Sequence, residues 1–428
     1  MKVKYAFNLG RVFTLSLAEI FAVFEQMLIS FRLIDLYREI LIIETETALP
    51  VQKLQKRLGG TIKIMEVVES LGRKKDAGPF YAFHEYFDAK ILKEKFLPPR
   101  PSKFNIGISI YPMAKGLPLR GENKRLGFMI KDILQQAGCS VRIVWPQNEA
   151  ISLASVVVTG ERLLEKGAEL DFLVAAERIY LAKTLTVQDF EDYGRRDYQR
   201  PARDPSIGML PPKVAQEMIN LAELPAKAVG NSKMALLDPF VGSGTILQEA
   251  MIMGYKTVGS DISEKAVDGA QKNLEWIKNR YKVPPGRFEL IVSDAKDLAA
   301  NLPRLNYEAV VTEGTLGPAY AKPPKEKQIE ANFKELEKIY LGAFKAWLNI
   351  LPSEKRIVIA LPAYHITGTY RCFEIVDKIK VLGYTVVDPV PAVVMEKYNF
   401  LLQTPRKSII YDRKDQFVSR EIFILKKN

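Results

Sequence analysis

The chain contains very little cysteine and histidine. Its 428 residues include two cysteines, Cys139 and Cys372, and two histidines, His84 and His365. Cysteines so far apart in sequence argue against a disulfide framework and against a cysteine-based zinc site. Two isolated histidines argue against a histidine metal site and against a catalytic triad built on histidine. We therefore expect no bound metal.

Long apolar runs are also missing. No segment approaches the ~20 apolar residues that span a bilayer. Arg11 and Glu19 interrupt the region where a signal peptide would be apolar. These absences predict a cytoplasmic protein without a membrane anchor. The length allows two or three domains, and the formal net charge of +12 favours a polyanionic partner.

One glycine turn is the most informative motif. The stretch from Leu236 to Thr245 reads as a buried strand, a tight turn and the start of a helix. Gly242 and Gly244 let the backbone bend sharply and approach a ligand. Leu247 occupies the place of the third glycine of a dinucleotide fingerprint, and no Gly-Lys-Ser/Thr follows. The turn therefore disfavours a phosphate-binding loop.

Acidic residues follow three successive predicted strands. Asp238 precedes the glycines, and its charge would repel a pyrophosphate but suit the cationic ammonium and sulfonium of S-adenosylmethionine (SAM). Asp261 is placed to bind ribose hydroxyls, and Asp294 to meet the adenine amine. An ordinary strand–turn–helix with capping residues is the alternative, but packing alone does not require three acids. The predicted cofactor-binding residues are Asp238, Phe240, Gly242, Gly244, Thr245, Asp261, Ile262, Asp294 and Ala295.

The chain changes its pattern near residue 200. The first 190 residues read as α+β, with a second unit that starts at Phe104, and Ser16–Glu19 reads as a capping box that opens a helix. From Gly208 onward strands and helices alternate, which predicts a mainly parallel sheet covered on both faces. The predicted strands there are Ala235–Asp238, Thr257–Asp261, Glu289–Ser293, Ala309–Thr312, Arg356–Leu361 and Ile422–Leu425.

Arginine and tyrosine are concentrated between the two halves. The stretch 193–205 is rich in Arg, Pro, Gly and Tyr, so we predict a linker rather than a helix or strand. Arginine forks and tyrosine rings grip phosphates and stack on unpaired bases. A polar tether, and a solvated face for the helix around residue 124, are the alternatives. The predicted RNA-binding residues are Arg195, Arg196, Arg200, Arg203, Lys124 and Arg125.

Several stretches of the chain together have the pattern of one enzyme family. They are the glycine turn Asp238–Thr245, the junction Arg196–Pro201, the helix start Gly208–Ala215, Leu153 with Lys166–Leu170, and the tail segments Tyr411–Arg413, Gln416 and Arg420–Ile422. In these stretches the chain resembles the THUMP-domain tRNA guanosine-N2 methyltransferases that modify position ten of tRNA in archaea and eukaryotes.

The resemblance implies an α/β fold of the class I SAM-dependent methyltransferases, with a Rossmann-like seven-stranded sheet. It also implies SAM as cofactor and tRNA as partner. The sequence leaves open whether the chain needs a small activator subunit, as the eukaryotic branch of the family does. The predicted domains are a ferredoxin-like domain at 1–100, a THUMP RNA-binding domain at 101–187, a linker at 188–207 and a catalytic domain at 208–428.

The chain departs from this family after its fourth catalytic-domain strand. The family carries Asp-Pro-Pro-Tyr there, whereas Glu313-Gly314-Thr315-Leu316 follows Thr312 here. Glu313 takes the Asp place and needs room for an extra methylene, which Gly314 would provide. Leu316 takes the Tyr place and loses base stacking worth roughly 1–3 kcal/mol, although Tyr320 could supply a ring. The candidate catalytic residues are Glu313, Thr312 and Leu316.

The predicted function is SAM-dependent methylation of the exocyclic N2 of a guanosine in tRNA. One alternative is an RNA-binding protein with a SAM fold and a degenerate catalytic loop. The other is an amino-methyltransferase that acts on adenine N6 in RNA or DNA.

Overall fold

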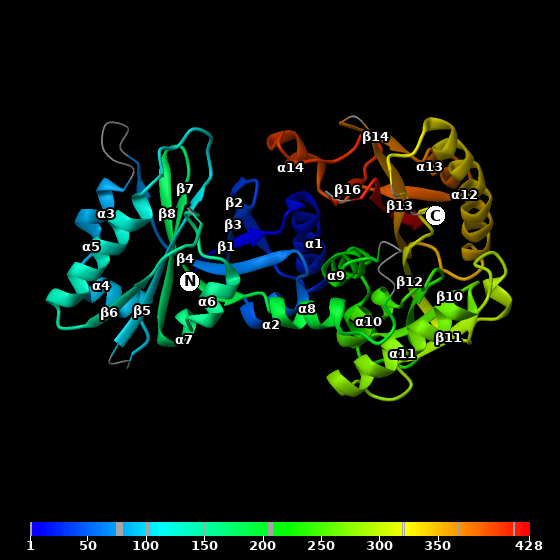
Figure 1. Cartoon of the computed structure of the whole chain (residues 1–428), viewed down its shortest axis with the longest axis horizontal. Helices are drawn as coiled ribbons and strands as arrows, with labels where there is room; N and C mark the ends of the chain where they lie inside the picture. Colours follow the sequence, from blue (N-terminus) through cyan, green and yellow to red (C-terminus); the bar gives the residue numbers. More distant parts are fainter. Residues whose placement is uncertain are drawn as a thin grey trace. The chain divides into compact units, whose positions relative to one another are not determined.

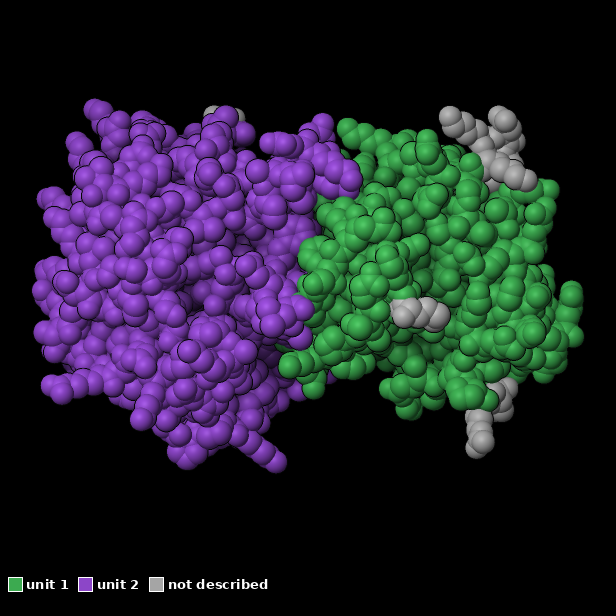
Figure 2. All heavy atoms as spheres, turned by 180° about the vertical axis from the view of Figure 1, so that it is seen from behind, with its two compact units in different colours: residues 1–13, 29–56, 61–190 green, residues 14–28, 57–60, 191–428 purple. Residues whose placement is uncertain are grey.

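The computed structural model divides the chain into two compact units (Figure 2). Unit 1 comprises residues 1–13, 29–56 and 61–190, and unit 2 comprises residues 14–28, 57–60 and 191–428. The predicted domain boundaries at 100/101 and 207/208 fall outside the described residues and stay predictions. The structure describes residues 2–73, 80–99, 103–148, 150–203, 209–318, 320, 322–366, 368–413 and 416–428.

Unit 1 is built on one eight-stranded sheet with the order β2-β3-β1-β4-β8-β7-β5-β6 (Figure 1). The neighbours from β2 to β4 pair antiparallel, and the chain order βαββαβ with this strand order is ferredoxin-like. β4 pairs antiparallel with β8, so the following strands extend the same sheet. The strands are β1 (Val3–Leu9), β2 (Phe31–Tyr37), β3 (Ile40–Thr45), β4 (Thr61–Gly72), β5 (Lys103–Pro112), β6 (Ser140–Val144), β7 (Gly167–Val174) and β8 (Arg178–Val187).

Three helical segments of unit 1 pack on the second half of its sheet. Apolar side chains of α3, α5 and η1 form one buried cluster with those of β5, β7 and β8. Burial of this cluster removes apolar surface from water, which stabilises the fold by about 25 cal/mol for each Å² buried. The bounds are α2 (Val51–Arg57), α3 (Tyr81–Tyr86), α4 (Ala89–Ile91), the π-helical turn η1 (Leu92–Phe96), α5 (Glu122–Gln136), α6 (Ser155–Gly160) and α7 (Leu163–Lys166).

The first helix corrects one sequence prediction. α1 (Phe13–Gln26) begins before Ser16, so Ser16 and Glu19 lie inside the helix and the predicted capping box is wrong. The Ser16 hydroxyl donates to Glu217 at 3.1 Å. The buried Glu19 carboxylate accepts from the backbone N–H groups of Gly59 and Gly60, both at 2.8 Å. The two polar side chains therefore serve contacts within unit 2 rather than the helix end.

Unit 2 is built on a nine-stranded sheet whose main path is β11-β10-β9-β12-β13-β17-β15. The neighbours from β11 to β13 pair parallel, and β17 runs antiparallel between β13 and β15. This seven-strand path confirms the predicted class I methyltransferase architecture. Its strands are β9 (Met234–Asp238), β10 (Lys256–Asp261), β11 (Phe288–Val292), β12 (Asn306–Glu313), β13 (Arg356–Ile366), β15 (Tyr384–Val387) and β17 (Val418–Lys427), with short β14 (Thr369–Cys372) on β13 and β16 (Ile409–Tyr411) on β17.

Helices pack on both faces of this sheet (Figure 1). Side chains of α12 and α13 form one buried cluster with those of the central strands. α10 and α11 form a second cluster with residues of β11. The helices are α8 (Phe190–Tyr198), α9 (Pro212–Leu221), η2 (Ala226–Ala228), α10 (Thr245–Ile252), α11 (Glu264–Tyr281), η3 (Leu298–Ala300), α12 (Glu326–Trp347), α13 (Val376–Val381) and α14 (Ala392–Lys397).

The stretch predicted as an irregular linker begins with a helix. α8 spans Phe190–Tyr198, so the prediction of a segment without regular structure is wrong for these residues. Arg196 explains part of the difference, because its guanidinium pairs with Asp192 one turn earlier and with Glu249 of α10. These ion pairs fix the helix within unit 2.

Candidate functional site

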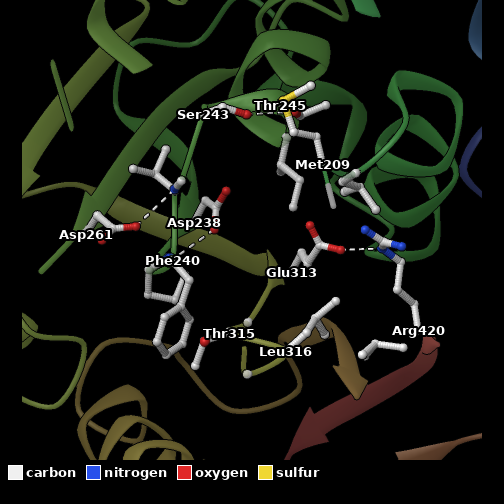
Figure 3. Close-up of a pocket in the computed structure, with 18 of the residues that line it drawn as sticks. Met209, Asp238, Phe240, Ser243, Thr245, Asp261, Glu313, Thr315, Leu316 and Arg420 are labelled. Carbon is white, nitrogen blue, oxygen red and sulfur yellow. Dashed lines mark hydrogen bonds and ion pairs between the residues drawn. The ribbon is translucent and has the colours of Figure 1, made fainter. Parts of the chain in front are cut away.

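The carboxyl ends of the parallel strands in unit 2 surround a cavity of about 650 Å³ (Figure 3). Ligands of open α/β sheets bind at this edge. Residues after β9, β10, β11 and β12 line the cavity, and the C-terminal strand β17 closes one side. All predicted catalytic and cofactor-binding residues except Thr312 and Gly244 line it directly.

The glycine turn after β9 has the conformation that its sequence requires. Gly242 and Gly244 have φ of +49° and +80°, where a side chain would be strained. The Gly242 N–H donates to Asp261 Oδ2 at 3.0 Å, and the Ser263 N–H donates to Oδ1 at 3.0 Å. The turn therefore holds the Asp261 carboxylate at the cavity. Gly244 lies directly before α10 and packs on Ala270 rather than on the cavity.

Asp238 is a buried acid at the end of β9. Thr312 Oγ1 donates to its Oδ1 at 2.7 Å, and the Phe240 N–H donates to the same atom at 3.3 Å. Burial, together with the nearby charges of Asp261 and Glu313, raises the pKa of Asp238 to about 7 against these hydrogen bonds. The arrangement suits a cation, because three carboxyl groups share one cavity.

Asp294 and Ala295 extend the cavity after β11. The Lys296 N–H donates to Asp294 Oδ1, and Lys296 Nζ lies 3.1 Å from Oδ2. Ala295 is buried, whereas Ile262 after β10 is 72% exposed at the rim. The structure thus places these predicted residues in the same cavity as Asp238 and Asp261.

Glu313 ends β12, the strand that pairs with β9, and is ion-paired with Arg420 of β17 (Figure 3). Burial raises the pKa of the Glu313 carboxyl, while the Arg420 guanidinium lowers it. Arg420 is almost fully buried and also donates to Gln416 at 3.2 Å. Thr312 supports the site through Asp238 instead of lining the cavity.

The loop after Glu313 is held by α12. A Cβ at Gly314 would lie 2.1 Å from Tyr340 Oη, and this hydroxyl donates to the carbonyl of Thr315 at 2.8 Å. The Tyr340 ring therefore fills the space that Gly314 leaves. Leu316 is half-buried on the cavity wall, where Tyr320 also lies.

Two predicted RNA contacts have other partners. Arg196 pairs with Glu249 at 2.9 Å, and Arg200 donates to Thr245 Oγ1 at 2.6 Å. Both arginines are buried with these partners inside unit 2, so we do not propose them as RNA contacts. Arg203, Lys124 and Arg125 are exposed, and Arg195 is partly exposed. For those four residues RNA contact stays a prediction.

Some residues of the cavity had not been predicted. Arg420 and Gln416 lay in the tail that resembles the family, but no motif showed that β17 reaches Glu313. The stretch Gly208–Ala215 was predicted to start a helix, but the sequence did not show that Met209 and Leu210 line the cavity. The additional lining residues are Met209, Leu210, Ile339, Gln416, Phe417, Val418 and Arg420.

Two further features are absent from the residues that the structure describes. No helix there is long and apolar enough to cross a membrane. Across the same residues, His, Cys, Asp and Glu side chains form no group that could hold a metal ion.

Residues 199–358 match a family model described as an RMKL-like methyltransferase domain. Two curated relatives, each named tRNA (guanine(10)-N2)-dimethyltransferase, match a similar region. The protein of Pyrococcus abyssi is 29% identical over 193 residues, which is 45% of this chain and 46% of the relative. The protein of Methanothermobacter thermautotrophicus is 32% identical over 189 residues, which is 44% of this chain and 48% of the relative. The chain thus aligns with about half the length of these relatives.

The fold comparison covers more of the chain. The crystal structure of TrmN from Thermus thermophilus has a TM-score of 0.56 and 14% identity, and the match covers 99% of this chain and 100% of that one. At this identity the similarity shows the fold alone. It confirms the fold class predicted from the sequence. The resemblance to the tRNA guanosine-N2 methyltransferases is supported by the sequence relatives over the region that they cover.

Proposed function

We propose that this chain, which carries an RMKL-like methyltransferase domain over residues 199–358, is a SAM-dependent methyltransferase that modifies the exocyclic N2 of a guanosine in tRNA. One observation carries the proposal. A single cavity is lined by four acids at the ends of four neighbouring strands, Asp294, Asp261, Asp238 and Glu313. The relatives named as tRNA guanine-N2 dimethyltransferases support the choice of base and substrate.

The acids of the cavity fit SAM. Asp261, fixed by two backbone N–H groups, would accept hydrogen bonds from ribose hydroxyls. Asp238 would face the cationic end, which offsets a buried cluster of negative charge. Asp294 and Ala295 would meet the adenine. When bound, SAM supplies a methyl group on a sulfonium that needs no further activation.

Glu313 would orient the base. The lone pair of guanine N2 is delocalised into the ring, so an acceptor must turn its N–H bonds for the lone pair to face the donor. The Glu313 carboxylate would accept from N2–H and take the proton that N2 loses. Leu316 and Tyr320 would contact the base faces. The cavity lies at strand ends within unit 2, so the base would leave its stack to enter it.

The tRNA itself would be held by basic surface residues. The formal net charge of +12 and the exposed Lys124 and Arg125 support a polyanionic partner. We propose that residues 101–187 act as a THUMP domain in this binding, that 188–207 connects it to the catalytic domain, and that the reaction takes place in the cytoplasm. A small activator subunit remains a prediction.

A second candidate function has two observations in its favour. The carboxylate that would orient the amine is already ion-paired with Arg420, and the loop lacks Asp-Pro-Pro-Tyr. A protein that binds tRNA and SAM without transfer would show the same features. Transfer activity separates the two candidates.

The decisive experiment is transfer of a radiolabelled methyl group from SAM to unmodified tRNA transcripts, followed by nucleoside analysis. We expect N2-methylated guanosine. Glu313→Ala should lower transfer by about 100-fold or more, as loss of a single transition-state hydrogen-bond partner does, with SAM affinity nearly unchanged by calorimetry. Asp261→Ala should weaken SAM binding by about tenfold or more.

Glu264→Ala is the matched control, because Glu264 is exposed at the start of α11, just beyond Asp261. It should change neither quantity. SAM binding without transfer to any tRNA of a broad panel would favour the second candidate. Methylated adenosine as the product would identify adenine N6, and not guanine N2, as the methyl acceptor.

A further inference from the structure

The ion pair between Glu313 and Arg420 lies inside the proposed substrate cavity. The two residues are 107 positions apart in sequence, and both line the cavity. Arg420 Nε donates to Oε1 of the carboxylate. Within the part of the chain that the structure describes, Oε2 has no hydrogen-bond partner. The pair therefore presents a carboxylate oxygen to whatever fills the cavity.

The edges of the bases differ in what they offer to such a group. Guanine presents two adjacent donors, N1–H and N2–H. Adenine and cytosine each present one amino donor next to a ring nitrogen that accepts. An ionised carboxylate only accepts, whereas a protonated one also donates. An ionised Glu313 would thus pair with guanine and repel the ring nitrogen of adenine, while a neutral Glu313 would pair with either.

Burial works against the ionised form. Desolvation raises the pKa of Glu313, and the Asp238 carboxyl lies near enough for the two charges to disfavour each other. Arg420 and, less strongly, Arg413 act in the opposite direction. The charge of Glu313 also acts on the Tyr340 hydroxyl of α12, but this hydroxyl donates to the Thr315 carbonyl and stays neutral, since burial raises its pKa. Of the two arginines, Arg420 thus has the larger effect in keeping Glu313 ionised.

We propose that Arg420 is a positioning residue that holds Glu313 as an acceptor-only group aimed into the cavity, so that the pair selects guanine over adenine and cytosine. The inference rests on the proposed function, whose base it explains. Arg420 has a fixed place for this task, because its strand β17 pairs along its length with β13, the neighbour of β12. The resulting preference for guanine would come from the Glu313–Arg420 pair and not from the residues proposed to bind SAM.

The test compares Arg420→Gln, which removes the charge, with Arg420→Lys, which keeps it. Initial rates on tRNA are measured from pH 6 to pH 9 at saturating SAM. Without Arg420 the pKa of Glu313 should rise further, so the acid limb of Arg420→Gln should move to higher pH by about one unit or more. Arg420→Lys should keep the wild-type limb. A merely structural loss would lower rates equally at every pH.

A binding arm makes the result independent of transfer. Affinities for 5′-GMP and 5′-AMP are measured by calorimetry with S-adenosylhomocysteine present. Wild type should bind GMP at least about tenfold more tightly than AMP. Glu313→Gln, whose amide both donates and accepts, should lose this preference. Arg420→Gln should lose it at pH 6.5 and regain it at pH 9, with unchanged affinity for S-adenosylhomocysteine as the check on folding.

The outcomes separate the inference from the proposed function. Guanosine methylation by wild type together with an unshifted pH profile for Arg420→Gln would overturn the role of Arg420 and leave the function standing. GMP preference that depends on Glu313 and Arg420, without transfer to any tRNA, would support base selection and overturn the catalytic function. Equal binding of GMP and AMP by wild type would overturn the inference directly.

Discussion

At the residue scale, the buried acid Asp238 combines a stability cost with a binding role. Its pKa of about 7 in the folded chain lies well above the usual ~3.9 of an aspartate. A group with a raised folded-state pKa stabilises the fold below its unfolded pKa, and this contribution is lost as the pH rises through the folded value. The chain therefore carries a destabilising charge at neutral pH that a bound cation would offset.

Asp238→Asn should remove that cost. We expect the variant without cofactor to gain thermal stability relative to wild type, with a larger gain at pH 8 than at pH 5, while SAM binding is strongly weakened. Thermal unfolding at the two pH values and calorimetry measure both effects. Asp294→Asn is the control: Asp294 is partly exposed and paired with Lys296, which lowers its pKa despite some burial, so no gain should appear. An equal gain at both pH values would contradict the assignment.

At the element scale, the loop after β12 and the helix α12 form one packed unit. Tyr340 fills the space over Gly314 and holds the Thr315 carbonyl, while Asn332 donates to Tyr364 at 2.7 Å. A Cβ at Gly317 would meet Asn332 at 2.2 Å. The family sequence with prolines could not occupy this loop unless the α12 side chains changed as well. The departure from Asp-Pro-Pro-Tyr is thus matched by side chains elsewhere.

Gly314→Ala should lower the free energy of unfolding by about 1–3 kcal/mol, because the added methyl overpacks against Tyr340. In Gly314→Ala/Tyr340→Ala the two losses should be less than additive, since the truncated ring vacates the space. Urea unfolding measures all three variants. Gly194→Ala in α8, where a Cβ meets nothing within 4 Å, should be neutral or slightly stabilising. Strict additivity would show that the two positions do not interact.

At the scale of the whole molecule, the excess of positive charge is expected to act on tRNA and not on the cofactor. A surface of net charge +12 releases counterions when phosphates bind, so tRNA affinity should fall steeply with salt while SAM affinity changes little. The exposed Lys124 and Arg125 of α5 are the sharpest candidates for phosphate contacts.

Lys124→Ala/Arg125→Ala should reduce the slope of log K against log salt by up to ~2, about 0.9 per lost phosphate contact. Filter binding of one tRNA from 50 to 300 mM KCl measures it. Lys378→Ala is the control, because Lys378 is exposed on α13 and paired with Glu337 at 2.5 Å. Equal slopes for the double variant and wild type would remove α5 from the RNA-binding surface.

The sequence alone determined the features that depend on residues close together in the chain. The glycine turn, the strand ends at Asp238, Asp261 and Asp294, and the alternation of strands and helices follow from backbone freedom and from local apolar periodicity. These patterns also sufficed for the class I fold, because parallel strands bring their carboxyl ends to one edge. The short strand β15 was missed, since four residues carry too little periodicity.

Only the tertiary structure decided which polar side chains meet. Ser16 and Glu19 have capping-box spacing, but Ser16 hydrogen-bonds Glu217 and Glu19 hydrogen-bonds the backbone N–H groups of Gly59 and Gly60. The predicted RNA contact Arg200 is buried on Thr245. Arg420 reaches Glu313 across 107 positions because β17 folds back beside β13. Local patterns define where a charge lies in the chain, whereas its burial and partner depend on contacts between distant segments.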